Sequence, residues 1–347
     1  MKVVFLYTEL AAYFLKCCET LAKQAEIHII RWPVNKEAPF DFNENDGIKL
    51  YTKSAYSFKE LKALLHSIQP DVLVCSGWID KEYLKLCKQY FRKIPTVLTC
   101  DTHWKGSLKQ YLAVLISRFT LQRIFSHAWV PGEIQTKYVL KLGFKANRIQ
   151  KGFYCCDLDL FNQIFRKRSE KDFALSTKRF LYIGRYYDFK GLPELWTAFL
   201  ELQQEEPNEW ELWCLGTGSL EGPDHKKVKH FGFIQPKDLE PILLLSTVFV
   251  LPSRFEPWAV VVHEMAAAGF PLVLSNAVGA GEKFLKVGDN GFMFAAGDKN
   301  ALKMQLKKVI HLSEIQLKQM SEQSHRLAQE INPGLWSQCV MNIYNGN

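Results

Sequence analysis

Residues 247–275, TVFVLPSRFEPWAVVVHEMAAAGFPLVLS, decide the fold class. The short apolar runs 247–251 and 271–275 have the length and composition of buried strands. Between them, residues 257–268 are expected to form a helix that begins at a proline and stops before Gly269. A strand, a helix and a second strand in this order are the repeating unit of a parallel α/β sheet.

The same alternation continues on both sides of this stretch. Short apolar runs lie at 3–7, 27–30, 72–75, 96–100, 128–130, 180–184 and 211–215, with segments of helical period between most of them. Ser57 and Glu60 form the capping box of one such helix. We therefore predict an α/β protein with doubly wound parallel sheets. Glu9 interrupts the apolar segment that begins with the run 3–7, and no small-residue cleavage site follows. We therefore interpret this run as the first strand rather than a signal peptide.

Length and charge suggest two different halves. At 347 residues with 48% hydrophobic side chains, the chain is long enough for about two domains. Residues 1–170 hold 26 Lys and Arg against 16 Asp and Glu, whereas residues 171–347 hold 18 against 20. The first half is thus expected to face an anionic partner: nucleic acid, a membrane surface or a phosphorylated substrate.

The expected location is the cytoplasm. The nine cysteines show no regular ladder and no C-x-x-C motif, which fits a reducing compartment and indicates no zinc site. No uncharged apolar stretch is long enough to span a bilayer. A charged run at 166–172 indicates a linker at 153–178 between two similar halves, and ligands are expected at the carboxyl ends of the strands.

Two groups of residues in the second half have the chemistry of a ligand site. Glu256 is expected at the N-cap of the helix 257–268 and Glu264 lies about 12 Å further along its axis, a span that suits an extended ligand. The amides of Trp258, Ala259 and Val260 would point at that ligand. Arg185 follows a strand and Lys190 follows on the next turn, which is how a parallel sheet presents two cations to a phosphate.

In order, these residues resemble a family. The motifs are Gly184-Arg185, Lys190-Gly191, Gly216-Thr217-Gly218, Phe231-Gly232-Phe233, 251–258 (LPSRFEPW), Glu264, Gly269-Phe270-Pro271 and 288–292 (GDNGF). They are similar to the nucleotide-sugar domain of the retaining family 4 glycosyltransferases of the GT-B fold. The resemblance implies two Rossmann-like doubly wound domains that face a central cleft. It assigns 1–152 to an N-terminal acceptor-binding domain, 179–328 to a C-terminal nucleotide-sugar-binding domain, and 329–347 to a helix that packs back on the first domain.

The resemblance also implies roles for single residues. Arg185 and Lys190 would grip the donor diphosphate, Glu264 would bind the ribose, and Glu256 with the helix amides would hold the donor sugar. The donor-binding residues are then Gly184, Arg185, Lys190, Phe233, Ile234, Glu256, Trp258, Ala259, Val260 and Glu264, with Phe233 and Ile234 at the nucleobase. Ala259 departs from the family, which usually has glycine there.

The N-terminal half offers further candidates. Asp101 and His103 follow the strand 96–100, where the family places a catalytic His near the donor sugar, and a helix cap or an exposed loop explains them equally well. Glu133 could face the cleft or merely favour a helix dipole. The Asp157-x-Asp159 pattern resembles a metal-binding signature, but it falls in the interdomain connection, so we expect a metal-independent enzyme without a cofactor.

Residues 105–126 combine cations with apolar residues at helical spacing. The cations are Lys105, Lys109, Arg118 and Arg123. A helix lying on an anionic membrane and contacting a lipid-linked acceptor explains this pattern, and so does a helix packed on the core with solvated charges. Both interpretations stay open at this point.

The expected function is that of a retaining glycosyltransferase in cell-surface polysaccharide or glycoconjugate synthesis. It would move a sugar from a UDP- or GDP-linked donor to a hydroxyl of a glycan or lipid-linked acceptor, in the cytoplasm or peripherally at the inner face of the membrane. The alternatives are a sugar-nucleotide epimerase of GT-B architecture and a non-catalytic sugar-nucleotide-binding protein. Nucleic acid is not an expected partner, because no recognised binding motif accompanies the basic half.

Overall fold

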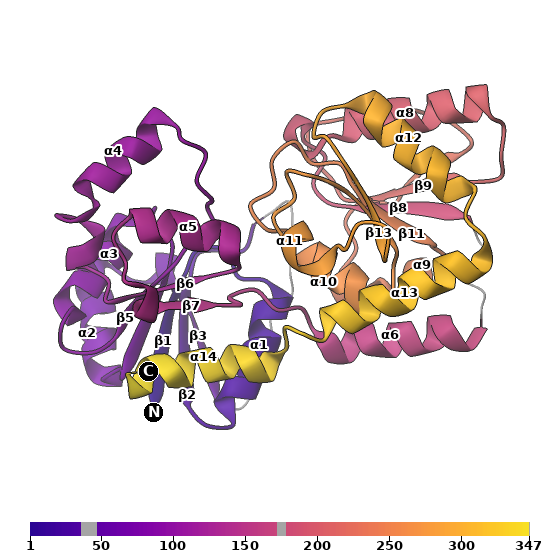
Figure 1. Ribbon diagram of the computed structural model, residues 1–347. Helices are drawn as coiled ribbons and strands as arrows, with labels where there is room; N and C mark the ends of the chain where they lie inside the picture. The colour runs from indigo at the N-terminus through magenta and orange to yellow at the C-terminus, as the bar shows by residue number, and fades with distance from the viewer. Residues whose placement is uncertain (36–46, 172–177, 347) are drawn as a thin grey trace. The chain divides into compact units, whose positions relative to one another are not determined.

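The computed structural model describes residues 1–35, 47–171 and 178–346. The chain divides into two compact units, Met1–Cys156 with Ile331–Asn347, and Asp157–Glu330. Each unit is a parallel sheet covered by helices (Figure 1). The predicted α/β class with two doubly wound sheets is therefore confirmed.

The first unit contains a seven-stranded sheet of order β3-β2-β1-β4-β5-β6-β7. Its strands are β1 (Lys2–Tyr7), β2 (Glu26–Arg31), β3 (Ile48–Thr52), β4 (Val72–Ser76), β5 (Thr96–Thr99), β6 (His127–Val130) and β7 (Ile149–Lys151). Its helices are α1 (Ala12–Ala22), α2 (Phe58–Ile68), α3 (Lys81–Tyr90), α4 (Leu108–Ser117), α5 (Glu133–Lys141) and α14 (Pro333–Asn345). The capping box of Ser57 and Glu60 at the start of α2 is formed as predicted.

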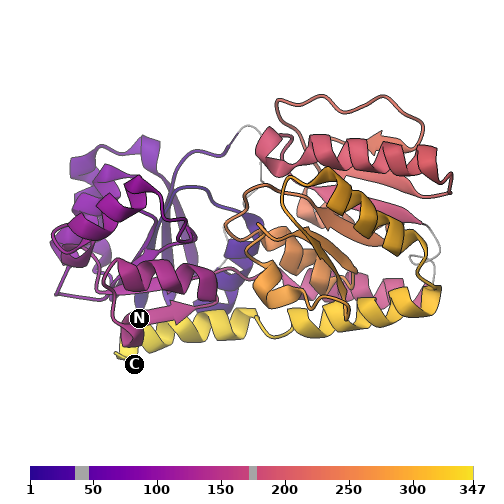
Figure 2. The same ribbon diagram turned by 45° about the horizontal axis from the view of Figure 1, so that its top comes forward.

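Helices cover this sheet on both faces (Figures 1 and 2). Successive side chains of a strand point to opposite faces, so Val4 and Leu6 join one apolar cluster with residues of α2, α3 and α5. Phe5 points the other way and packs against Phe14 of α1 and Trp336 of α14. The Trp336 indole N–H donates to the Phe153 carbonyl at 2.7 Å. The last helix of the chain is thus a fixed part of the first unit, as expected.

The second unit contains a six-stranded sheet of order β10-β9-β8-β11-β12-β13. Its strands are β8 (Arg179–Ile183), β9 (Glu211–Leu215), β10 (Val228–His230), β11 (Val248–Leu251), β12 (Leu272–Ser275) and β13 (Gly291–Phe294). Its helices are α6 (Leu158–Lys171), α8 (Leu192–Glu205), α9 (Glu240–Leu243), α10 (Val260–Ala267), α11 (Gly281–Phe284), α12 (Lys299–Ile310) and α13 (Glu314–Ala328). Helices α8 and α12 pack together on one face, and α6, α10 and α13 on the other.

The expected linker at 153–178 is wrong over most of its described length, because it contains helix α6. Phe161, Ile164 and Arg168 follow one another at helical spacing and are buried. The Arg168 guanidinium donates to the carbonyl of Ser246 at 2.7 Å and lies over the Phe270 ring. The charged run at 166–172 predicts an exposed linker, whereas the structure buries one of its charged residues, Arg168, on the inner face of a helix. Residues 172–177 lie outside the described residues.

Candidate active site

The carboxyl edge of the second sheet is built from close backbone contacts. The Gly184 N–H donates to the Leu215 carbonyl at 3.0 Å, and the Gly216 N–H donates to the Gly232 carbonyl at 2.7 Å. A Cβ on Gly216 would lie 1.9 Å from the Gly184 carbonyl oxygen, so a side chain at this position is sterically excluded. The loops after β8, β9 and β10 therefore lie directly against one another and leave their backbone groups near any ligand at this edge.

Lys190 and Glu256 form an ion pair at this edge, although they lie 66 positions apart in the chain. Only 17% of the Lys190 side chain and 13% of that of Glu256 are exposed. Gly191, with φ of 72°, ends the turn that carries Lys190, and a Cβ there would lie 2.2 Å from the Pro252 carbonyl oxygen. The order of the strands, with β8 beside β11, brings these two loops together. The pair places one cation and one carboxylate where the sequence predicts the donor sugar and its diphosphate.

The helix after Glu256 differs from expectation. It begins at Val260 rather than at Pro257, and its N-cap is Ala259 rather than Glu256. Ala259 adopts φ of 80°, in the left-handed region where a side chain is strained, and this is the position where the resembled family has glycine. Because Glu256 precedes the helix, the expected 12 Å along a common axis does not describe this site.

The loop of Glu256 is held by the loop after β12. The Glu256 N–H donates to the Ala277 carbonyl at 3.2 Å, and the Gly279 N–H donates back to the Glu256 carbonyl at 3.0 Å. The Trp258 side chain is buried against Phe284, so only its backbone can serve a ligand. At the start of α10 the Val262 N–H donates to the carbonyl of the N-cap residue Ala259 at 3.1 Å, and the amides before it precede the first hydrogen-bonded turn, as at any helix N-terminus.

Glu264 lies in the second turn of α10. Burial of its carboxyl raises the pKa to about 7, and the negative charge of Asp157 adds to the effect. Asp157 precedes α6 and accepts the Leu160 N–H at 3.2 Å, so it caps that helix. A carboxyl with a pKa near neutrality changes its charge in the pH range where an enzyme works, which marks Glu264 as a candidate functional group.

The remaining candidates of this unit lie in loops at the same edge. Arg185 is exposed directly after β8, and its carbonyl accepts the Tyr182 hydroxyl at 2.9 Å. Phe233 and Ile234 are half-buried in the loop after β10. Among the described residues, no group of three or more His, Cys, Asp or Glu is arranged to hold a metal ion.

This part of the chain is similar to a known protein family. Residues 177–311 match the family model described as "Glycosyl transferases group 1". The group 1 segment therefore contains Arg185, Lys190, Glu256 and Glu264 together with the loops that hold them.

Curated relatives match over part of the chain. A glycogen synthase of Mycobacterium tuberculosis is 31% identical over 139 residues, which are 38% of this chain and 33% of that protein. The lipopolysaccharide core biosynthesis glycosyltransferase LpsE of Rhizobium meliloti is 26% identical over 167 residues, 46% of each chain. The matched stretch thus spans about a third to a half of the length of these relatives.

A solved structure matches the whole chain. The structure described as trehalose-6-phosphate from E. coli bound with UDP-2-fluoro glucose has a TM-score of 0.75, at 11% identity, and 99% of each chain is covered. This likeness shows that the chain has the GT-B fold beyond the group 1 segment.

Asp101 and His103 belong to the first unit, at the carboxyl end of β5. Asp101 accepts the Tyr154 hydroxyl at 3.2 Å. Burial lowers the pKa of His103, and the positive charge of Lys105 adds to the effect, so the imidazole is neutral at pH 7. Glu133 forms an ion pair with Lys151 in the first unit. Contact of Asp101, His103 or Glu133 with a donor stays a prediction.

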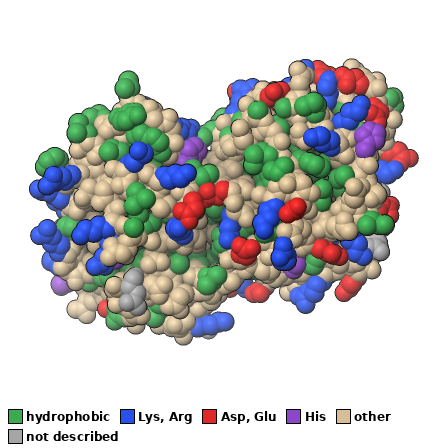
Figure 3. All heavy atoms as spheres, viewed as in Figure 1, with side chains coloured by type: hydrophobic (Ala, Val, Ile, Leu, Met, Phe, Trp, Pro, Cys, Tyr) green, Lys and Arg blue, Asp and Glu red, His purple; other side chains and the backbone are tan. Residues whose placement is uncertain are grey.

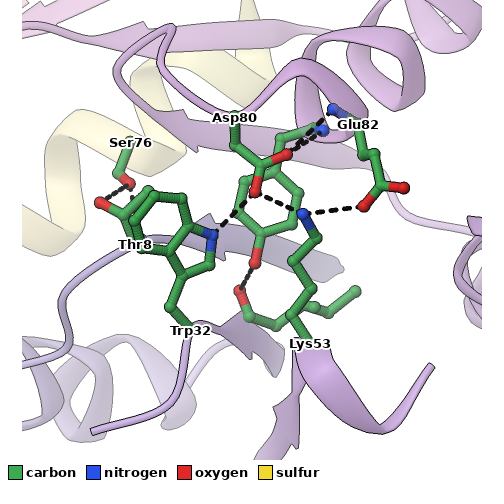
Figure 4. A network of polar contacts seen from close by, with 8 residues as sticks. Thr8, Trp32, Lys53, Ser76, Asp80 and Glu82 are labelled. Carbon is green, nitrogen blue, oxygen red and sulfur yellow. Dashed lines mark hydrogen bonds and ion pairs between the residues drawn. The ribbon is translucent and has the colours of Figure 1, made fainter. Parts of the chain in front are cut away.

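The sequence motifs do not predict a polar cluster that lies at the carboxyl edge of the first sheet (Figure 4). Asp80 caps α3, accepts the Trp32 indole N–H at 2.7 Å and pairs with Lys53 at 2.6 Å. Trp32 and Lys53, with Tyr56 and Glu82, also line a cavity of about 330 Å³. Trp32, Lys53 and Asp80 follow three different strands and form no motif, although their places after strand ends are the signal that could have found them.

Helix α4 exposes its apolar side chains. Leu108 is 88% exposed, Leu115 74% and Phe119, just after the helix, 65%. The other face of this region packs on the core through Ala113, Val114 and Ile124, so both features that the sequence suggested are present. Lys105, Lys109, Arg118 and Arg123 are exposed beside them, and Figure 3 shows hydrophobic and cationic side chains together over this part of the unit.

Proposed function

We propose that this chain is a retaining, metal-independent glycosyltransferase of family 4. It would transfer a sugar from a UDP- or GDP-linked donor to a hydroxyl of a glycan or lipid-linked acceptor. The observation that carries the proposal is the ion pair of Lys190 and Glu256, held at the carboxyl edge of the sheet within the group 1 segment. The solved structure with UDP-2-fluoro glucose and the two curated relatives, which are named for glycan synthesis, support a nucleotide-sugar donor.

The chemistry needs charge stabilisation more than a protein nucleophile. The acceptor oxygen forms a bond to the anomeric carbon while the bond from that carbon to the diphosphate oxygen breaks on the same face. The acceptor proton passes to an oxygen of the departing nucleoside diphosphate. Arg185 and Lys190 would stabilise the negative charge that develops on this leaving group. Glu256 would accept hydrogen bonds from the donor sugar, and Glu264 from the ribose.

A donor panel tests the proposal. We expect UDP- or GDP-linked sugars to raise the melting temperature, since a ligand that binds only the folded state stabilises it. We expect the stabilising donor to lose its sugar to an acceptor extract, with the anomeric configuration retained. Release of a free epimer without acceptor would instead show an epimerase. Stabilisation without turnover would show a sugar-nucleotide-binding protein, and no stabilisation by any donor would contradict the proposal.

We further propose that α4 lies on an anionic membrane surface, which would place the enzyme peripherally at the inner face of the cytoplasmic membrane. From residue 102 to residue 132 the sequence holds no Asp or Glu, so no like charge would repel anionic lipid along α4 and its flanks. Exposed leucines, a tyrosine and a phenylalanine flanked by Lys and Arg are the composition of an interfacial helix. No helix within the described ranges is long and apolar enough to cross a bilayer.

Replacing Leu108, Leu115 and Phe119 together by Ser is expected to weaken binding to vesicles that contain an anionic lipid by at least tenfold. The physical reason is the lost burial of three apolar side chains in the bilayer, each on the order of 1 to 3 kcal/mol. Vesicle sedimentation measures the effect. Ile315→Ser and Met304→Ser, at other exposed apolar residues, are the matched controls. Unchanged sedimentation of the triple variant would contradict the membrane proposal.

A further inference from the structure

A second cavity opens at the amino ends of β5 and β6. Its volume is about 720 Å³, and its walls come from the ends of these strands and from the loops 91–95, 122–126 and 143–148. Asp101 and His103 follow the carboxyl end of β5. The cavity is therefore at the edge of the first sheet opposite to those candidate residues, and the proposed donor chemistry does not use it.

The cavity is strongly cationic. Four exposed cations line it: Arg92, Lys93, Lys145 and Arg148. None of the thirteen residues that line it is Asp or Glu. Lys49 and Lys53, elsewhere in the first unit, each lie 2.6 Å from a carboxylate oxygen, whereas these four cations form no ion pair with any described residue. Gathered cations with no nearby carboxylate create a positive potential that attracts an anion.

One of these cations is held in place by a chain of hydrogen bonds. His127 is buried, and its Nε2 lies 2.8 Å from Nη1 of Arg148. A guanidinium can only donate, so Nε2 accepts and the imidazole proton sits on Nδ1. From Nδ1 that proton is donated to the Ser126 hydroxyl oxygen at 2.9 Å. The Ser126 hydroxyl donates in turn to the Thr96 carbonyl at 3.1 Å.

The hydrogen bond to His127 uses one N–H group of Arg148, and the remaining N–H groups can donate to an anion in the cavity. Burial lowers the pKa of His127 to about 4, and the positive charge of Arg148 contributes, which agrees with the neutral imidazole required as acceptor. A guanidinium fixed by a buried neighbour loses little freedom when it binds an anion, and its planar fork fits two oxygens of a phosphate.

We propose that this cavity binds a phosphate group. Arg148 is the fixed donor, and Arg92, Lys93 and Lys145 supply further charge around the rim. The phosphate belongs either to a free ion or ester in solution or to the headgroup of a lipid. Residues 122–126 of the cavity wall follow α4 closely in the chain, so a lipid phosphate would reach the cavity from the same surface on which α4 lies. The phosphate site itself does not depend on the proposed transferase activity.

The test uses inorganic phosphate as the probe and Lys190→Ala as the background in every protein, so that any contribution of the proposed donor site is reduced and is the same in all of them. At constant ionic strength, phosphate is expected to raise the melting temperature of the background protein in a saturable way. Lys93→Gln with Arg148→Gln is expected to weaken the apparent phosphate affinity at least tenfold. Lys93→Gln with Lys145→Gln leaves the buried hydrogen-bond chain intact and is expected to weaken it severalfold.

Lys59→Gln with Lys62→Gln, on exposed positions of α2, removes the same charge and is expected to change nothing. Vesicles of phosphatidylcholine with and without phosphatidic acid distinguish the two sources. If the Lys93 and Arg148 variant also loses binding to phosphatidic acid vesicles, the phosphate is that of a lipid, and if that binding persists, it is a free phosphate or ester. A melting temperature that does not respond to phosphate, or that responds equally in the cavity variants, would overturn the proposal.

Discussion

Lys190→Ala is expected to reduce the rate of sugar transfer about 10²–10³-fold, because the enzyme loses one of two cations that stabilise the leaving diphosphate. The loss should appear mainly in kcat, since the charge on the diphosphate grows as its bond to the sugar breaks. Initial rates of nucleoside diphosphate release with saturating acceptor measure it. A variant that retained near-normal turnover would contradict the role of Lys190.

The ion pair complicates a single replacement and also supplies its control. Removing Lys190 leaves the Glu256 carboxylate mostly buried without its cation, which costs stability by itself. The double variant Lys190→Ala with Glu256→Gln removes that unpaired charge. We expect the double variant to recover stability without recovering turnover. Recovery of both would show that Lys190 acts only on folding.

The second large effect is a pH dependence at Glu264. Ribose hydroxyls donate to a carboxylate more strongly than to a carboxylic acid. Since the pKa of Glu264 is raised to about 7, the affinity for a nucleoside-diphosphate sugar is expected to fall about tenfold as the pH drops from 8 to about 5.5. The diphosphate of such a donor is a diester and keeps its charge over this range. Calorimetric titration at several pH values measures the affinity.

The stability of the ligand-free protein should change in the opposite direction. The folded-state pKa of Glu264 lies above the value of 4.5 of a free glutamate, so the folded protein binds this proton more tightly. Its contribution to the free energy of unfolding therefore rises as the pH falls through 7 towards 4.5, by on the order of 2 to 3 kcal/mol.

Glu264→Gln should remove both trends, with weak donor binding at every pH, whereas Glu314→Gln at an exposed position should leave them intact. Donor affinity that is independent of pH in the parent protein would be evidence against ribose binding at Glu264.

The sequence could predict the strands and the fold class because buried parallel strands are nearly continuous apolar runs, as in β1 and β11. The predicted start of α10 is wrong because an alanine gives no local sign of the left-handed conformation that Ala259 adopts. The charged run predicts a linker where the structure has helix α6, since the burial of Arg168 depends on carbonyl groups far along the chain. For α4, the amphipathic spacing is the same for a helix that packs on the core and for one that faces outward.

The candidate sites differ in the same way. Sequence motifs indicate Arg185, Lys190, Glu256 and Glu264, whereas the ion pair between two of them follows from β8 lying next to β11. The cationic cavity could not be predicted from the sequence, because its residues come from separate segments at the amino edge of the sheet. Ligands are usually expected at the opposite edge, where the strands have their carboxyl ends.

The most direct measurement is a crystal structure of the protein with a bound nucleoside-diphosphate sugar. We predict diphosphate oxygens within about 3 Å of the Arg185 guanidinium and the Lys190 ammonium, and ribose hydroxyls at the Glu264 carboxylate. A nucleotide bound away from the loops after β8 and β11, with these three side chains uninvolved, would contradict the central claim.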